Sequence, residues 1–293
     1  MTRPLELDDL YAVSLPSDPQ LSPDGERVAF VLTGADREAD EDRSSIWLVP
    51  AGGGESERLT SGTSDLAPRW SPDGMTLAFL STRGEEGSKS QIHLLPVGGG
   101  EAHAITELPL GAGEPVWSPD GDRVAFAAVV DLDPDGGAAK PVATDRLDHK
   151  ADGIGLLKDL RTHLFVVPAS GAEPPQLTTG DFHVTQPVWS PDGSRLAYSA
   201  STTEDRDLEP AQAVYVVPAE GGEPERITPE DGAFAVVDWS RDGRTLLLAG
   251  RHRADVGHTK LFTVPASGGQ PTELLPGYDR NVMVGAPAYP GAL

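Results

Sequence analysis

The chain contains no cysteine, so disulfide bonds, thiolate metal ligands and a cysteine nucleophile are all excluded. Positive charge is scarce: 23 Lys and Arg against 46 Asp and Glu give a formal net charge of −23. A surface this acidic repels phosphate backbones, so we expect no nucleic-acid partner. No apolar run approaches the ~20 residues that a membrane span needs, and residues 1–9 lack the apolar core of a secretory signal. We therefore expect no membrane partner and a cytoplasmic location.

Catalytic and metal-binding motifs are also missing. A hydrolase nucleophile elbow reads Gly-x-Ser-x-Gly, and the two nearest segments, 62–66 and 87–91, each fail at the last position. The seven histidines form neither H-x-H nor H-E-x-x-H, the spacings that bind zinc. We predict that this chain holds no catalytic residues, no metal and no cofactor.

The strongest positive signal is a repeated turn. Ser-Pro-Asp-Gly, written Ser-Arg-Asp-Gly in the last copy, begins at Ser22, Ser71, Ser118, Ser190 and Ser240. The copies lie 49, 47, 72 and 50 residues apart, so one unit carries an insertion. Proline presets the second residue of such a turn, aspartate suits the third, and glycine adopts the left-handed conformation that follows. Each copy should therefore join two antiparallel strands. A tryptophan precedes four of the turns, at Trp70, Trp117, Trp189 and Trp239, and Leu21 takes that place in the first.

The segments after the turns predict sheets that are covered on both faces. Each turn is followed by a strand without polar alternation, at 27–31, 77–80, 124–127, 196–198 and 246–248. Such strands pack between two neighbouring sheets. A third strand stops at a proline, and a short fourth strand follows a Gly-rich turn; the prolines are Pro50, Pro96, Pro168, Pro218 and Pro265.

Four short strands repeated about every 48 residues are typical of β-propeller blades. We predict an all-β chain of four-stranded antiparallel blades: five complete blades, the start of a sixth, and hence an incomplete propeller of a longer protein. The expected blades span about 18–60, 65–106, 114–178, 186–228 and 236–275, and residues 280–293 begin the sixth. Residues 1–17 form an N-terminal segment, for which a short helix is one option.

The Trp-Ser-Pro-Asp-Gly unit resembles the repeats of TolB-like propellers and of the prolyl oligopeptidase family of serine peptidases. The similarity to bacterial acylaminoacyl-peptidase-like members extends over the chain and includes residues 7–25, 146–167, 257–262 and 278–291. The resemblance implies a propeller that gates and selects short peptides for a C-terminal α/β-hydrolase domain with a Ser-Asp-His triad. No such hydrolase domain is present in this chain, so the expected partners are that domain and short peptides. The oligomeric state stays open.

The insertion at about 131–161 holds the candidate site. It combines six charged or polar residues that the resemblance makes candidates for substrate contact: Arg146, Asp148, His149, Lys150, Asp152 and Arg161. Long loops in compact folds are often functional, but a solvated connection that packs on a neighbouring blade explains the same residues and is the preferred interpretation. Asp131, Asp133 and Asp135 match the first half of a calcium loop, but the twelfth position is Val142 rather than glutamate. A plain acidic loop is therefore the preferred interpretation.

Two single features have simpler interpretations. His93 occupies the column that holds aromatic residues in the other units, so we expect a packed ring rather than a ligand. The run Arg251-His252-Arg253 reads as an exposed turn.

Three functions remain open from the sequence: the propeller portion of a serine peptidase, a stand-alone TolB-like scaffold for a protein partner, and a lactonase-like propeller with a central metal. The last needs ligands at matching positions of several blades, and the repeat columns offer none.

Overall fold

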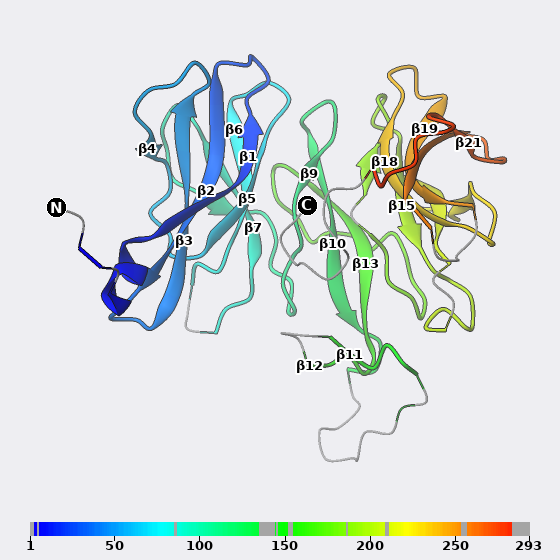
Figure 1. Ribbon diagram of the computed structural model, residues 1–293, viewed down its shortest axis with the longest axis horizontal. Helices are drawn as coiled ribbons and strands as arrows, with labels where there is room; N and C mark the ends of the chain where they lie inside the picture. The colour runs from blue at the N-terminus through cyan, green and yellow to red at the C-terminus, as the bar shows by residue number, and fades with distance from the viewer. Residues whose placement is uncertain are drawn as a thin grey trace. The chain divides into compact units, whose positions relative to one another are not determined.

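The computed structural model describes residues 3, 4, 6–84, 87–134, 144, 146–151, 155–185, 187–208, 211–252 and 257–282. Nearly all regular structure in these residues is antiparallel β-sheet (Figure 1), and a short 3-10 helix, η1 (Leu7–Ala12), precedes the first strand. The predicted all-β fold of four-stranded antiparallel blades is confirmed. Most of the expected sixth blade, residues 283–293, lies outside the described residues.

Four blades consist of four consecutive strands that pair in chain order. Blade 1 contains β1 (Ser14–Leu21), β2 (Arg27–Asp36), β3 (Glu41–Pro50) and β4 (Glu57–Arg58). Blade 2 contains β5 (Asp65–Trp70), β6 (Thr76–Ser81), β7 (Gln91–Pro96) and β8 (His103–Ala104). Blade 4 contains β14 (Val188–Trp189), β15 (Arg195–Ala200), β16 (Ala213–Pro218) and β17 (Glu225–Arg226). Blade 5 contains β18 (Ala233–Trp239), β19 (Thr245–Arg251), β20 (Lys260–Pro265) and β21 (Thr272–Glu273).

Blade 3 is the unit with the insertion. Its sheet contains β9 (Val116–Trp117), β10 (Arg123–Asp131) and β13 (Leu160–Pro168), and a single bridge from Phe165 to Gln176 marks the place of the fourth strand. The insertion between β10 and β13 carries a two-stranded ribbon of β11 (Lys150–Ala151) and β12 (Gly155–Leu156). Figure 1 shows this ribbon beyond the ends of β10 and β13.

The chain divides into two compact units, and the division passes through blade 3. Unit 1 comprises Met1–Phe126 and Val167–Pro174, and unit 2 comprises Ala127–Val166 and Pro175–Leu293. Blades 1 and 2 thus belong to unit 1, and blades 4 and 5 belong to unit 2.

The repeated turn has the same hydrogen bonds in all five copies. In the first, Ser22 Oγ donates to Asp24 Oδ1 at 2.5 Å and accepts the amide of Arg27 at 2.9 Å. The serine hydroxyl therefore bridges the turn aspartate to the strand that follows. The turn glycines have φ between 68° and 77°, a left-handed conformation that glycine adopts without steric cost.

In four of the blades, a buried threonine follows the fourth strand and binds the third strand. Its hydroxyl accepts the amide of a third-strand residue, as Thr106 Oγ1 accepts from Ile92 at 2.9 Å. The others are Thr60, Thr178 and Thr228. Because these threonines are at most 5% exposed, each bond satisfies an amide that water does not reach. Blade 5 has Leu275 in this position.

Neighbouring blades bury their apolar faces against each other. In unit 1 the shared core of blades 1 and 2 includes Ala29, Ile46, Leu77 and Phe79, each fully buried. In unit 2 the core of blades 4 and 5 centres on Val214, Phe234, Leu246, Leu248 and Phe262. The expected packing of strands between two sheets is thus confirmed within each unit. Four second strands have an alanine at the same position, and these alanines are 0% exposed: Ala29, Ala78, Ala125 and Ala197.

Candidate functional site

The insertion residues belong to unit 2 and form a network of charged side chains with blade 4. Of the six predicted candidates, Asp152 lies outside the described residues, as does Asp135 of the suggested calcium loop. Lys150 is exposed at the start of β11. The other four take part in specific contacts.

Arg146 and Asp148 pair with each other through two parallel hydrogen bonds. Arg146 Nε donates to Asp148 Oδ1 at 2.7 Å, and Nη2 lies 2.5 Å from Oδ2. This fork geometry suits guanidinium and carboxylate. The arginine lowers the pKa of Asp148, and Asp148 raises the pKa of Arg146. His149 Nδ1 lies 3.1 Å from the carbonyl oxygen of Arg146 and so helps to fix the same turn.

Arg161, on β13, is joined to blade 4 residues by a shared carboxylate. Arg161 Nε donates to Asp181 Oδ1 at 2.5 Å, and Arg206 Nη2 lies 2.7 Å from Asp181 Oδ2. Burial alone would raise the pKa of Asp181, but Arg206 and Arg161 outweigh it and lower the pKa. The Arg206 contact is an ion pair by distance, although its angles are poor for a hydrogen bond.

A backbone contact links the two halves of this network. The amide of Leu147 donates to Asp207 Oδ2 at 2.8 Å, which ties the insertion to the segment that follows β15. We call Arg146, Asp148, Arg161, Asp181, Arg206 and Asp207 the insertion cluster. Its six charges balance, yet Arg206 Nε is buried without a hydrogen-bond partner among the described residues. The cluster therefore retains an N–H donor for which the described residues provide no acceptor.

Two histidines lie beside the cluster, and burial lowers the pKa of both. His163 is 0% exposed, with Nδ1 3.1 Å from Thr178 Oγ1 and Nε2 3.0 Å from the carbonyl of Gly180. His183 Nδ1 accepts the amide of Thr162 at 3.2 Å, and the charge of Arg161 lowers its pKa further. These contacts make them neutral, structural residues near neutral pH.

Sequence reasoning found Arg146, Asp148 and Arg161 but missed Asp181, Arg206 and Asp207. Asp181 lies in the connection between β13 and β14, and Arg206 and Asp207 lie between β15 and β16. Each is at least 20 positions from Arg161 in the chain, and no sequence motif contains them. No sequence signal marks them, because the turns on either side of the segment 201–208 lie 50 residues apart, as in the units without an insertion.

The calcium interpretation gains no support from the described residues, which contain no group of three His, Asp or Glu side chains able to hold a metal ion. Asp131 Oδ1 instead accepts the amide of Asp133 at 3.0 Å, a local turn contact.

The other two sequence features are His93 and the run that begins at Arg251. His93 is 6% exposed and its ring lies 5.7 Å from that of Phe79, so the expected packed ring is confirmed. His252 is exposed in the bend after β19, as expected, and one face of its surroundings is the ring of Phe262, at 4.8 Å between centroids; Arg253 lies outside the described residues.

Unit 1 contains an ion-pair network that the sequence did not reveal. Arg69, on the first strand of blade 2, donates to Asp18 Oδ2 of blade 1 at 2.7 Å. Its other terminal nitrogen donates at 2.8 Å to Glu114 Oε2, two residues before the first strand of blade 3. One arginine thus joins three consecutive repeats.

Comparison with protein families matches two parts of the chain. Residues 13–140 match the TolB beta propeller domain, and residues 160–286 match the Tricorn protease N-terminal beta propeller domain. The chain consists of TolB-like and Tricorn-type propeller repeats. Within the described residues, no helix is long and apolar enough to cross a membrane.

Similar proteins with peptidase names share the fold and, in one case, a sizeable part of the sequence. The Bacillus subtilis (strain 168) uncharacterized peptidase YuxL is 35% identical over 224 residues, which are 73% of this chain and 34% of that protein. The structure of Pyrococcus horikoshii acylaminoacyl peptidase gives a TM-score of 0.73 at 20% identity, covering 92% of this chain and 41% of that one. The beta-propeller domain of the Trilobed protease from Pyrococcus furiosus gives 0.64 at 19% identity, with 92% and 74% covered. This propeller therefore corresponds to the propeller portion of peptidase-family proteins, and it spans about a third of the length of the curated relative.

Proposed function

We propose that this chain is the propeller of a serine peptidase of the prolyl oligopeptidase and acylaminoacyl-peptidase-like group, and that it gates and selects short peptides for an α/β-hydrolase domain. The main support is how the chain aligns with a solved acylaminoacyl peptidase. The alignment covers 92% of this chain but only 41% of that protein, so more than half of the peptidase has no counterpart here. The 35% identity with a curated peptidase points the same way.

The insertion cluster is the part of the propeller that we propose contacts the peptide. Arg146 and Arg206 keep 22% and 11% of their side chains exposed. Guanidinium groups bind carboxylates through charge-assisted hydrogen bonds. The group that this cluster would hold is the C-terminal carboxylate of a short peptide.

The first test uses the native protein at its full cellular length. A fluorophosphonate probe should label it, and hydrolysis should fall steeply as the peptide substrate is lengthened. A native product that is neither labelled nor active on peptides would contradict the peptidase proposal.

The second test addresses the cluster. Arg206→Gln should raise KM about tenfold for peptides with a free C-terminus and leave the KM of C-terminally amidated peptides unchanged. Arg43→Gln is the matched control, because Arg43 pairs with Asp36 in blade 1, outside unit 2. Equal losses for both kinds of peptide would assign Arg206 a purely structural role.

A stand-alone scaffold for a protein partner is the second candidate. It is favoured by the match of residues 13–140 to the TolB beta propeller domain. It predicts a native product with no reaction toward the serine probe and a stable complex with one protein.

A further inference from the structure

An arginine stacks on the tryptophan that precedes the next turn both in unit 1 and in unit 2. Arg27 lies over the ring of Trp70, 5.2 Å from its centroid, and Arg195 lies over Trp239 at 5.0 Å. Each pair joins consecutive blades within one unit. In both, the arginine is the second residue after the turn glycine, so the contact belongs to the repeat itself.

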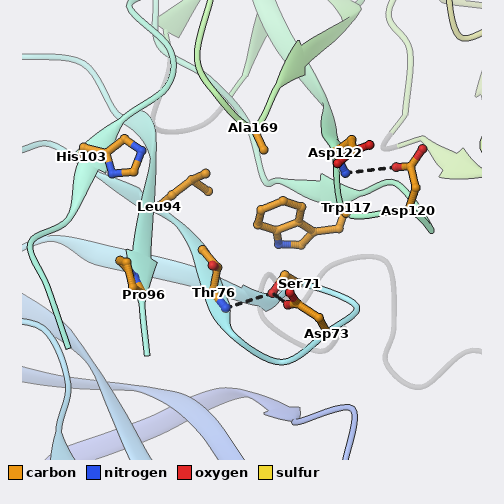
Figure 2. A pocket seen from close by; sticks show the side chains of 11 residues that line it. Ser71, Asp73, Thr76, Leu94, Pro96, His103, Trp117, Asp120, Asp122 and Ala169 are labelled. Atoms are coloured by element: carbon orange, nitrogen blue, oxygen red, sulfur yellow. Dashed lines mark hydrogen bonds between the residues drawn. The ribbon is translucent and has the colours of Figure 1, made fainter. Parts of the chain in front are cut away.

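Blade 2 has threonine in this position. Thr76 is the second residue after Gly74, and the tryptophan of the next turn is Trp117. The short threonine side chain leaves a cavity of about 330 Å³ lined by both residues. Figure 2 shows the Trp117 indole among the side chains that line this cavity, with Thr76 and Leu94 to one side of it and Asp120 and Asp122 to the other.

The indole of Trp117 is held in place by a hydrogen bond from its ring nitrogen. Trp117 Nε1 donates to the carbonyl oxygen of Arg69 at 3.0 Å, so the tryptophan is fixed without any group in the cavity. Leu94, 4% exposed, contributes an apolar wall. An aromatic face that is already fixed costs little further ordering when a ligand stacks on it.

The charges around the cavity favour a cation. Asp73, Asp120 and Asp122 line it, together with His103, and of these Asp120 also lies 3.9 Å through Oδ2 from Arg123 Nη2. In blade 4, hydrogen bonds from Ser190 and Ser194 lower the pKa of Asp192 most, and Arg195 adds to them. For Asp73, the corresponding residue of blade 2, Ser71 and Met75 lower the pKa, and no cation among the described residues contributes.

We propose that this cavity binds a guanidinium group, supplied either by a small molecule or by an arginine side chain of a polypeptide. The group stacks on Trp117, as Arg27 and Arg195 stack on their tryptophans, and Asp73, Asp120 and Asp122, which line the same cavity, supply the negative charge. The site does not depend on the proposed peptidase function.

The test follows the indole N–H signals of the five tryptophans in nitrogen-15 NMR spectra of the full chain. The probes are agmatine, a small guanidinium, and the blocked tripeptide acetyl-Gly-Arg-Gly-amide, with the citrulline tripeptide as an uncharged isostere. We expect the Trp117 signal to shift and saturate at millimolar concentrations of the guanidinium probes and to stay in place with citrulline. Binding of agmatine alone assigns the site to small cations, and equal or tighter binding of the tripeptide assigns it to polypeptide arginine.

Two variants exchange the arginine and the threonine that lie beside the tryptophans of blades 2 and 3. Thr76→Arg should fill the cavity with the chain's own guanidinium and weaken probe binding at least about tenfold. Arg27→Thr should open the equivalent space over Trp70, whose indole signal should then respond to the probe as well. If Thr76→Arg does not fold, Asp73→Asn with Asp122→Asn removes two charges and should weaken binding severalfold.

Three results would overturn the assignment. One is an equal response to the citrulline peptide, because it would show that charge is not recognised. Another is unchanged binding in Thr76→Arg or in the double asparagine variant. The third is a uniform shift of all five indole signals, which indicates general association of cations with an acidic surface.

Discussion

The guanidinium of Arg27 covers the ring of Trp70, and the same indole donates through Nε1 to the carbonyl oxygen of Gln20 at 3.0 Å. One tryptophan thus makes two contacts with the preceding blade, through its face and through its edge. Trp117 and Trp239 donate in the same way, to Arg69 and to Val188. The tryptophan of the repeated turn is therefore an inter-blade tie, and neighbouring blades are joined by directional bonds as well as by apolar packing.

Trp70→Phe should lower the free energy of unfolding by about 1–2 kcal/mol, because phenylalanine lacks the N–H donor and stacks less strongly with arginine. Urea denaturation followed by circular dichroism measures the loss. Trp47→Phe is the control, since Trp47 Nε1 donates only within its own strand, to Ser45 Oγ. Equal losses in the two variants would contradict the role of Trp70 as a tie between blades.

Thr106→Val should cost about 1–3 kcal/mol, because it preserves the shape of the side chain but leaves the buried amide of Ile92 without its acceptor. Thr106→Ser keeps the hydroxyl and should recover most of this loss. Hydrogen exchange at the Ile92 amide provides a local measurement and should accelerate in the valine variant only. A valine variant as stable as the serine variant would show that water or a neighbour satisfies the amide.

The turn aspartates make the fold sensitive to acid. Hydrogen bonds from Ser190, and then from the Ser194 amide and hydroxyl, lower the pKa of Asp192 from 3.8 to about 2. A group with a lower pKa in the folded state stabilises the fold above its unfolded pKa, and this contribution disappears as the pH falls from about 4 to about 2. Ser194→Ala removes one donor, so the Asp192 midpoint in a carbon-13 carboxyl titration should rise toward 3.8.

The Asp24 carboxyl supplies an internal control for that titration. Its turn has Glu26 where the fourth turn has Ser194, so its midpoint should not change in the Ser194→Ala variant. An Asp192 midpoint near 3.8 in the folded wild-type protein would contradict the contribution of the serine hydroxyls.

The blades were predictable from sequence because their determinants are local. Proline, aspartate and glycine specify the turn within four residues, and the absence of polar alternation indicates burial on both faces. Boundaries were less predictable. The first sheet begins at Ser14 rather than near residue 18, and the fourth strands are only two residues long. In four blades a threonine just beyond the fourth strand continues the hydrogen bonding to the third strand through its side-chain hydroxyl. Strand propensities describe backbone pairing only, so they do not predict this contact.

The charged networks were not predictable, because they depend on which connections meet in space. Arg161 was a candidate, but its partner Asp181 has no motif, and nothing in the sequence pairs Arg69 with Asp18 and Glu114. An arginine follows three of the turns, and no sequence motif gives it a role. Its function over a tryptophan, and the consequence of its replacement by Thr76, emerge only when consecutive blades are placed side by side.

Gly250 tests the packing of blade 5, where the backbone itself leaves no room for a side chain. A Cβ at this position would lie 2.1 Å from the carbonyl oxygen of Ala233 and 2.9 Å from the Cα of Phe234. Backbone atoms cannot turn aside as a flexible side chain does, so Gly250→Ala must separate β18 from β19, with an expected loss of about 3 kcal/mol.

Gly98→Ala is the matched control for this variant, because a Cβ there meets nothing within 4 Å and its backbone is not left-handed. Its stability should stay close to that of the wild type. Phe234 lies against both Gly250 and the ring of Phe262, at 5.3 Å between centroids. Near-ultraviolet circular dichroism should therefore lose intensity in Gly250→Ala before the sheet signal declines. An unchanged melting temperature in Gly250→Ala would mean that β18 and β19 adjust to the added methyl group, and that their close approach is not a requirement of this blade.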